Sequence, residues 1–500
     1  MNECTVPVRN LLLIPLVWAC HQAPDHDGDG SRSGLDCDDG DPGRAPGLQE
    51  VVGDGVDQDC DGSDHTTLAI REVATGRYST DRPGAQLGWT VACGADRGGD
   101  GTGDLAATAS EFGMNRIQHT FAAALPRPVR GEHAVEEVLD LRVGSNGTTA
   151  FQTLLGLVGE EHGGGLIVEH HGFDGRRRLH RMASLLTRSG RLRDATTTFG
   201  WTGGDVDHIY GQYGPSPYAG PAELTGDGLL DFALGPLVLE ALPEGVVDLG
   251  EAGRLALELS EESMPWAGVE NAIGDLNHDG QADLLFSSMV PPTWVVFGPI
   301  GDAPATRDGP QVAQFWPEKA DLATAQTFDA EVGDVSGDGV DDLVLANMWF
   351  GADPASPPDT GVGAVHVWFG PLEAGRYTTD TADVRFIGEL EGAWTGRGLT
   401  LADLDGDGTK NLVVGAPAYA LMLPGLVYVF DDPLRPGDLT AGDAIAILRG
   451  EEPNATTGFS LAACDTDGDG RDELVIGAPR VDHSEKVYDA GVFYWLDGLL

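Results

Sequence analysis

The stretch DLDGDGTKNLVVGAP at residues 403–417 places three aspartates within five positions and then runs directly into an apolar segment. The carboxylates alternate along the chain, at Asp403, Asp405 and Asp407, and Gly408 follows them. A hard cation such as Ca²⁺ takes about six to eight oxygen ligands, and a tight loop supplies them from alternate residues. Glycine permits the sharp turn after the third ligand. The stretch therefore predicts a calcium loop that leads into a β-strand.

The same nine-residue pattern occurs six times, with oxygen-bearing groups favoured at positions 1, 3, 5 and 9 and glycine at position 6. One copy alone could be an acidic turn, because Asp, Asn and Gly are common turn residues. Six copies with the same glycine favour metal loops. The predicted ligands are Asp96, Asp100, Asp104; Glu223, Thr225, Asp227, Asp231; Asp275, Asn277, Asp279, Asp283; Asp334, Ser336, Asp338, Asp342; Asp403, Asp405, Asp407, Asn411; and Asp465, Asp467, Asp469, Glu473.

The spacing of the loops predicts a repeat architecture. A degenerate copy at residues 160–168 keeps Gly165 but has lost the carboxylates of positions 5 and 9, and it fills the wide gap between the first two loops. The chain then contains seven repeats of about 60 residues each. Each loop is followed by a short apolar strand that begins at position 9, and further strands complete the repeat. Four strands per repeat are typical of a propeller blade.

The repeat resembles the FG-GAP repeat of integrin alpha chains and their bacterial relatives, down to the Gly-Ala-Pro triplets at 415–417 and 477–479. The resemblance covers residues 66–500. It implies an all-β fold, a seven-bladed β-propeller with calcium loops in the hairpins between the first two strands of each blade. It also implies a ligand-binding rim of loops on the opposite side. No metal is predicted for the degenerate second repeat.

A propeller must join its last blade to its first or leave an exposed strand edge. The last repeat ends without an outer strand, and the segment TTLAIREV at 66–73 is predicted to be the N-terminal strand that completes the last blade. Cys93 and Cys464 lie just before the first and last loops, where a disulfide would lock this closure. Two buried free thiols are the alternative.

The N-terminus resembles an export signal. The nine-residue apolar run at 11–19 is too short to span a bilayer but suits a signal peptide over residues 1–19. The following Cys20 resembles the acylated cysteine of a bacterial lipobox, and export without a lipid is the alternative. We expect a protein of the bacterial cell envelope, an outer-membrane lipoprotein or an extracellular protein, that meets the membrane only through an N-terminal lipid.

Residues 20–65 are predicted to be an acidic metal-binding stalk, because their carboxylates alternate along the chain. They contain almost no apolar residues, which favours the alternative of an unstructured spacer. They resemble the MopE-type metal-binding motif of bacterial surface proteins, although oxygen ligands favour Ca²⁺ over copper. Within this segment, Cys37 and Cys60 are the simple disulfide pair. The candidate ligands are Asp25, Asp27, Asp29, Asp36, Asp38, Asp39, Asp41, Asp57, Asp59 and Asp61.

The formal charge of −50 argues against nucleic acid as a partner. The chain contains no H-E-x-x-H zinc helix and no G-x-S-x-G nucleophile turn. We therefore expect a non-catalytic binding or adhesion protein whose protein or glycan ligand binds the rim opposite the calcium hairpins. The long connections 204–222 and 351–362 are candidate contacts. The alternatives are a propeller-type enzyme acting on polysaccharide or phospholipid, and a metal-sequestering surface protein.

Overall fold

The computed structural model divides the chain into two compact units, Met1–Asp64 and His65–Leu500. It describes residues 38, 44, 66–94, 102–109, 121–125, 128–138, 141–144, 149–158, 165–172, 177–182, 190–191, 197–200, 218–239, 245–248, 253–258, 267–288, 291–317, 329–351, 360–418, 421, 423–484 and 487–499. Across these residues, no helix has the length and apolar character that a membrane crossing requires.

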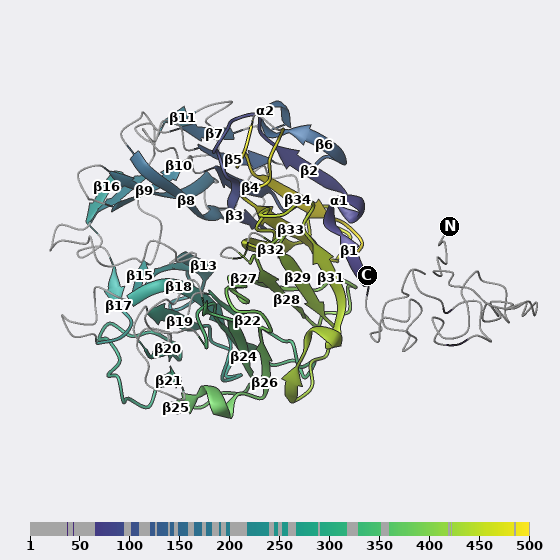
Figure 1. Ribbon diagram of the computed structural model, residues 1–500. Coiled ribbons are helices and arrows are strands. Elements are labelled where there is room, and N and C mark those ends of the chain that lie inside the picture. Colours follow the sequence, from purple (N-terminus) through teal and green to yellow (C-terminus); the bar gives the residue numbers. More distant parts are fainter. Residues whose placement is uncertain are drawn as a thin grey trace, which may run out of the picture. The chain divides into compact units, whose positions relative to one another are not determined.

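Strands dominate the second unit, and those described pair into seven sheets (Figure 1). The first three sheets along the chain hold the following strands, each given from the innermost outward. The first is β3 (Leu87–Cys93), β4 (Leu105–Ala109), β5 (Phe121–Leu125), β7 (Leu141–Gly144) and β11 (Gly190–Arg191). The second is β8 (Thr149–Val158), β9 (Gly165–Gly172), β10 (Arg177–Met182), β12 (Thr197–Gly200) and β16 (Gly245–Asp248). The third is β13 (Tyr218–Ala222), β14 (Asp231–Leu234), β15 (Leu237–Leu239) and β17 (Arg254–Leu255).

The four remaining sheets follow the same order. The fourth is β18 (Ala267–Gly274), β19 (Asp283–Ser288), β20 (Thr293–Val296), β21 (Val312–Trp316) and β25 (Gly375–Thr378). The fifth is β22 (Asp329–Gly333), β23 (Asp342–Asn347), β24 (Ala364–Trp368), β26 (Val384–Ile387) and β30 (Gly437–Leu439). The sixth is β27 (Gly398–Ala402), β28 (Asn411–Ala416), β29 (Leu426–Phe430), β31 (Ala444–Arg449) and β1 (Thr66–Ala69). The seventh is β32 (Ser460–Cys464), β33 (Glu473–Ala478), β34 (Val492–Leu496), β2 (Gly76–Ser79) and β6 (Gly131–Ala134).

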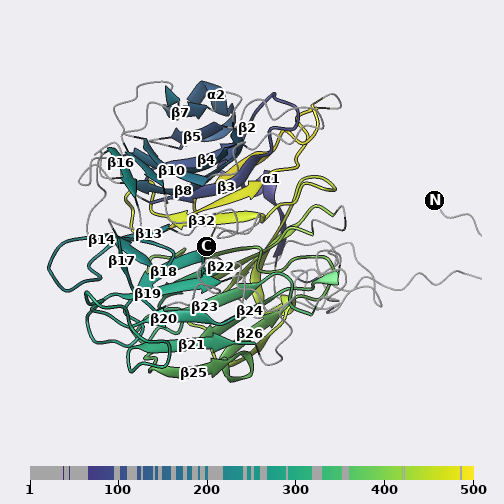
Figure 2. The same cartoon turned by 90° about the vertical axis from the view of Figure 1, so that its left-hand side faces the viewer.

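The innermost strands of these sheets touch one another in a closed circuit. Each contacts the next in the order β3, β8, β13, β18, β22, β27 and β32, and β32 returns to β3. Figures 1 and 2 show the sheets arranged around this circuit, with strands such as β25 at the periphery. Buried apolar side chains fill the space between neighbouring sheets, as Val344, Val367 and Leu412 do between the fifth and sixth. The fold is therefore an all-β propeller, as the sequence predicted.

Most sheets carry one strand more than the predicted four. The outer strand comes from the next repeat along the chain and pairs in parallel with the fourth strand, as β25 does with β21 and β30 with β26. In the described chain, the predicted number holds only for the sheet of β13, β14, β15 and β17. The extra strand covers an edge that would otherwise present unpaired backbone groups.

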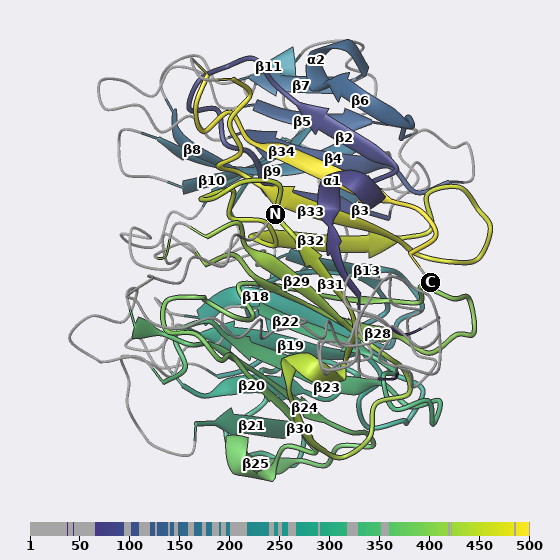
Figure 3. The ribbon, with the colours of Figure 1, turned by 45° about the vertical axis from the view of Figure 1, so that its right-hand side comes forward.

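The prediction that residues 66–73 complete the last sheet is wrong. The first part of residues 66–73 forms β1, which pairs in parallel with β31 of the sixth sheet, and the second part forms the short helix α1 (Ile70–Val73). The strand that completes the last sheet is β2, which pairs antiparallel with β34 (Figure 3). A second short helix, α2 (Val135–Val138), follows β6. The N-terminal segment thus ties two neighbouring sheets together.

Side-chain packing explains why β2 is the strand that pairs with β34. All four of its residues are buried, and the ring of Tyr78 stacks on that of Phe493 with 4.6 Å between centroids. Arg77 is tolerated there because its guanidinium bonds Glu451 at 2.6 Å. The burial of a charged residue in a four-residue strand depends on that distant partner, which local sequence patterns do not reveal.

Candidate metal loops

Five of the predicted loops lie entirely within the described residues, at 223–231, 275–283, 334–342, 403–411 and 465–473. Each connects the innermost strand of a sheet to the second strand, as 403–411 connects β27 to β28. Of the first loop, Asp104 is described and is buried, whereas Asp96 and Asp100 lie outside the described residues. The degenerate copy at 160–168 is described only from Gly165 onward.

The carboxylate at position 1 organises the backbone of its own loop. The Oδ1 atom of Asp465 accepts the amide of Gly468 at 2.6 Å, and its Oδ2 atom accepts the amide of Gly470 at 3.0 Å. Asp334 and Asp403 accept the corresponding amides at 2.7–2.9 Å, and Asp275 accepts those of Asp279 at 2.9 Å and Gly280 at 2.8 Å. In the loop at 223, Glu223 replaces Asp and accepts the amides of Gly226 and Asp227. In all five loops, the carboxylate at position 1 therefore accepts at least two amides from positions 4 to 6 of its own loop.

The side chain at position 9 connects the loop to the segment that follows the third strand of the sheet. Asp283 is fully buried, and its Oδ2 atom accepts the amide of Leu276 at 2.8 Å while its Oδ1 atom accepts the amide of Gly298 at 2.9 Å. Asp342 makes the same two contacts, with Val335 at 2.9 Å and Gly370 at 2.8 Å. Position 9 therefore fixes the hairpin as well as adding a carboxylate to the loop.

Burial of the carboxyl groups at position 9 disfavours their charged form. Desolvation raises the pKa of Asp283 to about 7, that of Asp342 to about 6 and that of Glu473 to about 7, although backbone amides oppose the shift in each case. The neighbouring carboxylates Asp465 and Asp467 also raise the pKa of Glu473. Such groups gain from a nearby cation, which would restore their charged form.

Two loops gather three or more carboxylates. In Asp465, Asp467, Asp469 and Glu473, one carboxylate oxygen from each residue lies within 4.8 Å of the others. The same holds for Asp403, Asp405 and Asp407. No other such group of His, Cys, Asp or Glu occurs in the described part of the chain. The loops at 223, 275 and 334 substitute neutral oxygens at position 3, from Thr225, Asn277 and Ser336.

The loop at 223–231 contains an orphaned acceptor. Asp231 is fully buried, and its Oδ1 atom has no hydrogen-bond partner among the described residues. Its Oδ2 atom is already occupied by the amides of Leu224 at 2.9 Å and Thr225 at 3.0 Å. An unpaired carboxylate oxygen is costly to bury. The all-oxygen donor sets of the five loops fit a hard cation rather than a soft one.

Asp432 is an acidic neighbour that the repeat pattern did not identify. It follows β29, beside the loop whose position 9 carries the neutral Asn411, and its Oδ2 atom is buried with no hydrogen-bond partner in the described part of the chain. Burial, followed by the charges of Asp407 and Asp405, raises the pKa of Asp432 to about 6. A signal existed in the sequence, because FDDP at 430–433 stands where two other repeats read FGP.

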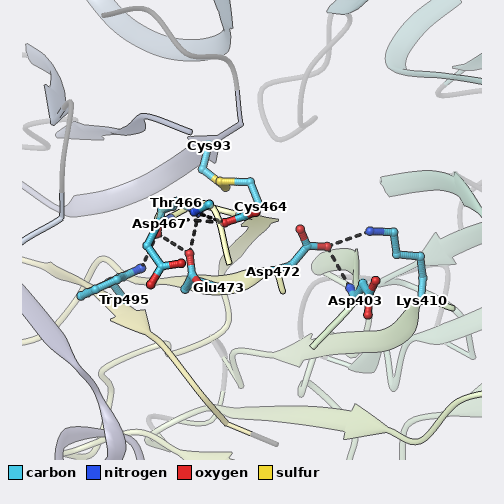
Figure 4. The surroundings of a disulfide bond; sticks show 11 residues. Cys93, Asp403, Lys410, Cys464, Thr466, Asp467, Asp472, Glu473 and Trp495 are labelled. Atoms are coloured by element: carbon cyan, nitrogen blue, oxygen red, sulfur yellow. Dashed lines mark hydrogen bonds and ion pairs between the residues drawn. A yellow bond between two sulfur atoms is a disulfide. The ribbon is translucent and has the colours of Figure 1, made fainter. Parts of the chain in front are cut away.

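The predicted bond between Cys93 and Cys464 is present as a disulfide in the structure (Figure 4). It joins β3 to β32, with 5.9 Å between the two Cα atoms. The loop at 465–473 begins at the next residue, and there the indole nitrogen of Trp495 donates to the hydroxyl of Thr466 at 3.2 Å. The disulfide and this acidic loop therefore meet at the seam of the ring.

Most of the predicted stalk lies outside the described residues. Asp38 is described, and its carboxylate pairs with Arg44 at 3.5 Å. The other candidates outside the described residues are Asp25, Asp27, Asp29, Asp36, Asp39, Asp41, Asp57, Asp59 and Asp61, together with Cys20, Cys37 and Cys60. The same is true of residues 204–217 and 352–359, the larger parts of the two candidate rim loops.

Fold and loops together define a class: an all-β propeller whose inner hairpins carry acidic loops of the metal-binding type. A sequence profile of the FG-GAP repeat matches residues 457–494, and one described as "Putative metal-binding motif", of the MopE type, matches residues 36–66. The chain thus contains an FG-GAP repeat and a MopE-type motif, and its β-propeller unit is similar in part to integrin alpha chains.

Characterised relatives match part of the chain. Human phosphatidylinositol-glycan-specific phospholipase D is 38% identical over 109 residues, which cover 20% of this chain and 13% of the human protein. Integrin alpha-PS2 of Drosophila melanogaster is 31% identical over 164 residues, covering 30% of this chain and 11% of the integrin. A solved structure titled "Crystal structure of BBS1N in complex with ARL6DN, soaked with lead" covers 85% of this chain and 94% of its own, with a TM-score of 0.40 and 9% identity. The chain thus spans a small part of the length of these two relatives.

Proposed function

We propose that this chain is an exported, calcium-stabilised binding or adhesion protein without catalytic activity. The observation that carries the proposal is shared by the five described loops: in each, the carboxylate at position 1 accepts amides of its own loop, and in two of them three or more carboxylates gather. We count the seven sheets as seven blades of one propeller, five of which have a fully described acidic loop.

Calcium is the proposed ion because the donors are carboxylate, amide and hydroxyl oxygens. The residues at positions 1, 3 and 5 would hold it, for example Asp403, Asp405 and Asp407. When bound, the ion supplies positive charge that neutralises these carboxylates, and its binding energy adds to the stability of the folded chain. We assign it no catalytic role.

The proposed location is the cell surface. Similarity to integrin alpha chains and to the MopE-type motif supports an extracellular or surface protein. The apolar run before Cys20 supports export, with a lipid on Cys20 as the proposed anchor in a bacterial envelope. The proposed ligand is a protein or glycan on the loop rim opposite the acidic hairpins. The phospholipase similarity spans too little of that enzyme to transfer its activity.

Thermal unfolding of the full chain tests the proposal, with excess Ca²⁺, with excess Mg²⁺ and with chelator, alongside bound metal measured by mass spectrometry. We expect about five to seven calcium ions per chain and a clear rise in Tm with Ca²⁺. When free Ca²⁺ is at 100 times the dissociation constant of a site, binding at that site adds roughly 2.7 kcal/mol to the free energy of unfolding. The exposed Asp380→Asn variant should behave as wild type, whereas Asp469→Asn should lose one ion. Equal Tm values with and without Ca²⁺, and no bound calcium, would overturn the proposal.

A further inference from the structure

Asp472 forms hydrogen bonds with the first residue of the neighbouring acidic loop. It is position 8 of the loop 465–473, and its Oδ2 atom accepts the backbone amide of Asp403 at 2.8 Å. Its own amide donates to the carbonyl of Asp403 at 2.7 Å. The ammonium group of Lys410, from the same loop as Asp403, also reaches that Oδ2 atom at 2.8 Å (Figure 4). Asp403 is therefore held on both sides of its backbone by a residue of the next sheet.

The relationship repeats around the ring. Position 8 of the loop 334–342 is Asp341, whose Oδ2 atom accepts the amide of Asp275 at 2.8 Å. The amide of Lys410, position 8 of its own loop, donates to the carbonyl of Asp334 at 2.8 Å. Across the seam, the amide of Gly103 donates to the carbonyl of Asp465 at 3.1 Å. In each case position 8 of one loop holds position 1 of the preceding loop.

Both ends of this contact belong to the scaffolds that shape the loops. Asp403 accepts the amides of Gly406 at 2.7 Å and Gly408 at 2.9 Å. Asp472 directly precedes Glu473, which accepts the amide of Thr466 at 2.6 Å inside the other loop. A cation that orders the loop 465–473 would therefore also fix Asp472. Fixing Asp472 in turn fixes the backbone of Asp403, which carries the first carboxylate of the loop 403–411.

We propose that Asp472 is a positioning residue that couples cation binding in the loops 403–411 and 465–473, so that occupation of either raises the affinity of the other. The inference rests on the proposed calcium binding. Such coupling is reciprocal, and coupling energies between sites commonly correspond to about 5- to 150-fold in affinity. The sign of the coupling energy distinguishes this proposal from simple electrostatics, because direct repulsion between two dications would weaken the second binding event.

Hydrogen–deuterium exchange of the full chain, followed by mass spectrometry at graded free Ca²⁺, resolves each loop as its own peptide. The midpoint of calcium-dependent protection then reports the affinity of that loop. We expect Asp407→Asn, which disables the loop 403–411, to raise the midpoint of peptide 465–473 by at least fivefold. In the Asp472→Ala background, which keeps only the backbone bond to the Asp403 carbonyl, the same substitution should shift that midpoint by less than half as much. Peptide 275–283 should not respond in either background.

The matched control is Asp341→Ala, which removes the equivalent carboxylate from another pair of loops. It should leave the coupling between 403–411 and 465–473 intact. Asp472→Asn, which preserves the shape of the side chain, provides a second variant if Asp472→Ala fails to fold, and it should reduce the coupling through loss of the charged acceptor. An unmoved 465–473 midpoint in Asp407→Asn, while the loops still respond to Ca²⁺, overturns the coupling alone. Loops that show no calcium response overturn the proposed function as well.

Discussion

Cys93 and Cys464 form a disulfide between β3 and β32, the innermost strands of the first and last sheets. The bond closes the ring independently of the strand pairing of β2 with β34. We expect Cys93→Ala/Cys464→Ala to lower the free energy of unfolding by roughly 2–4 kcal/mol, because a cross-link restricts the unfolded chain. Urea unfolding of the oxidised proteins measures the difference. Identical midpoints for wild type and the double variant would show that the bond adds no stability.

The position 6 glycines are predicted to be required for their backbone conformation rather than for space. Gly280 has a φ of +82°, and an added Cβ would meet no atom within 4 Å. We expect Gly280→Ala to cost about 1–2 kcal/mol of stability, because L residues are strained in this region. Gly301 is the matched control, since its added Cβ is equally free and its φ is not in the strained region. Chemical denaturation should find Gly301→Ala within about 0.5 kcal/mol of wild type. Equal costs at both positions would refute the conformational argument.

Asp432 is predicted to tune the loop 403–411 through its charge. Because the loop carboxylates act on it electrostatically, Asp432→Asn should relieve repulsion in the calcium-free protein and raise its Tm. The same loss of charge should weaken calcium binding by roughly fivefold, the equivalent of about 1 kcal/mol. Calcium titration of the loop peptide by hydrogen exchange gives the affinity, with Asp380→Asn as the control for net charge. A variant with unchanged affinity and unchanged calcium-free Tm would exclude this role.

His366 on β24 predicts a specific pH dependence of stability. Burial lowers the pKa of His366 to about 4, and the charge of Arg385 lowers it as well. The unfolded chain takes up the proton near pH 6.5, so the contribution of the neutral imidazole is full above that pH and is lost as the pH falls to 4.

The measurement is urea unfolding at pH 8, 6.5, 5 and 4 for wild type and His366→Phe, a substitution that keeps an aromatic ring beside Trp368. The carboxylates titrate alike in both proteins, so the difference between their curves isolates His366. Wild type should lose roughly 3 kcal/mol relative to the variant between pH 8 and pH 4. Parallel stability curves would contradict the prediction.

Sequence periodicity identified much of the fold because the loop, the glycine and the following strand lie within one short segment. The predicted strands after position 9 are confirmed as β19, β23, β28 and β33. The contacts that cross between repeats were not predictable in this way. Arg77 is buried by Glu451, and Asp472 holds Asp403, although neither pair is close in sequence. Such pairs become neighbours only when the ring is assembled.

The candidate site shows the same division. The repeat pattern located the acidic loops, whose backbone scaffolds depend on residues within nine positions of one another. It did not reveal that position 9 braces the loop against the following strand, as Asp342 does through Gly370. It also passed over Asp432, because that carboxylate comes from the segment after β29 and not from the loop itself. Side chains delivered from other segments carry no fixed spacing from the motif.

The pairing of β1 with β31 and of β2 with β34 also has a consequence for biosynthesis. The first strands to leave the ribosome must wait for the last ones, which at ordinary rates of synthesis takes roughly 20–80 s. Until then, the edges of the waiting strands are open to pairing with other chains. The seam thus forms only after β34 has been synthesised, and a nascent chain that stops before β34 would be prone to aggregation through β2.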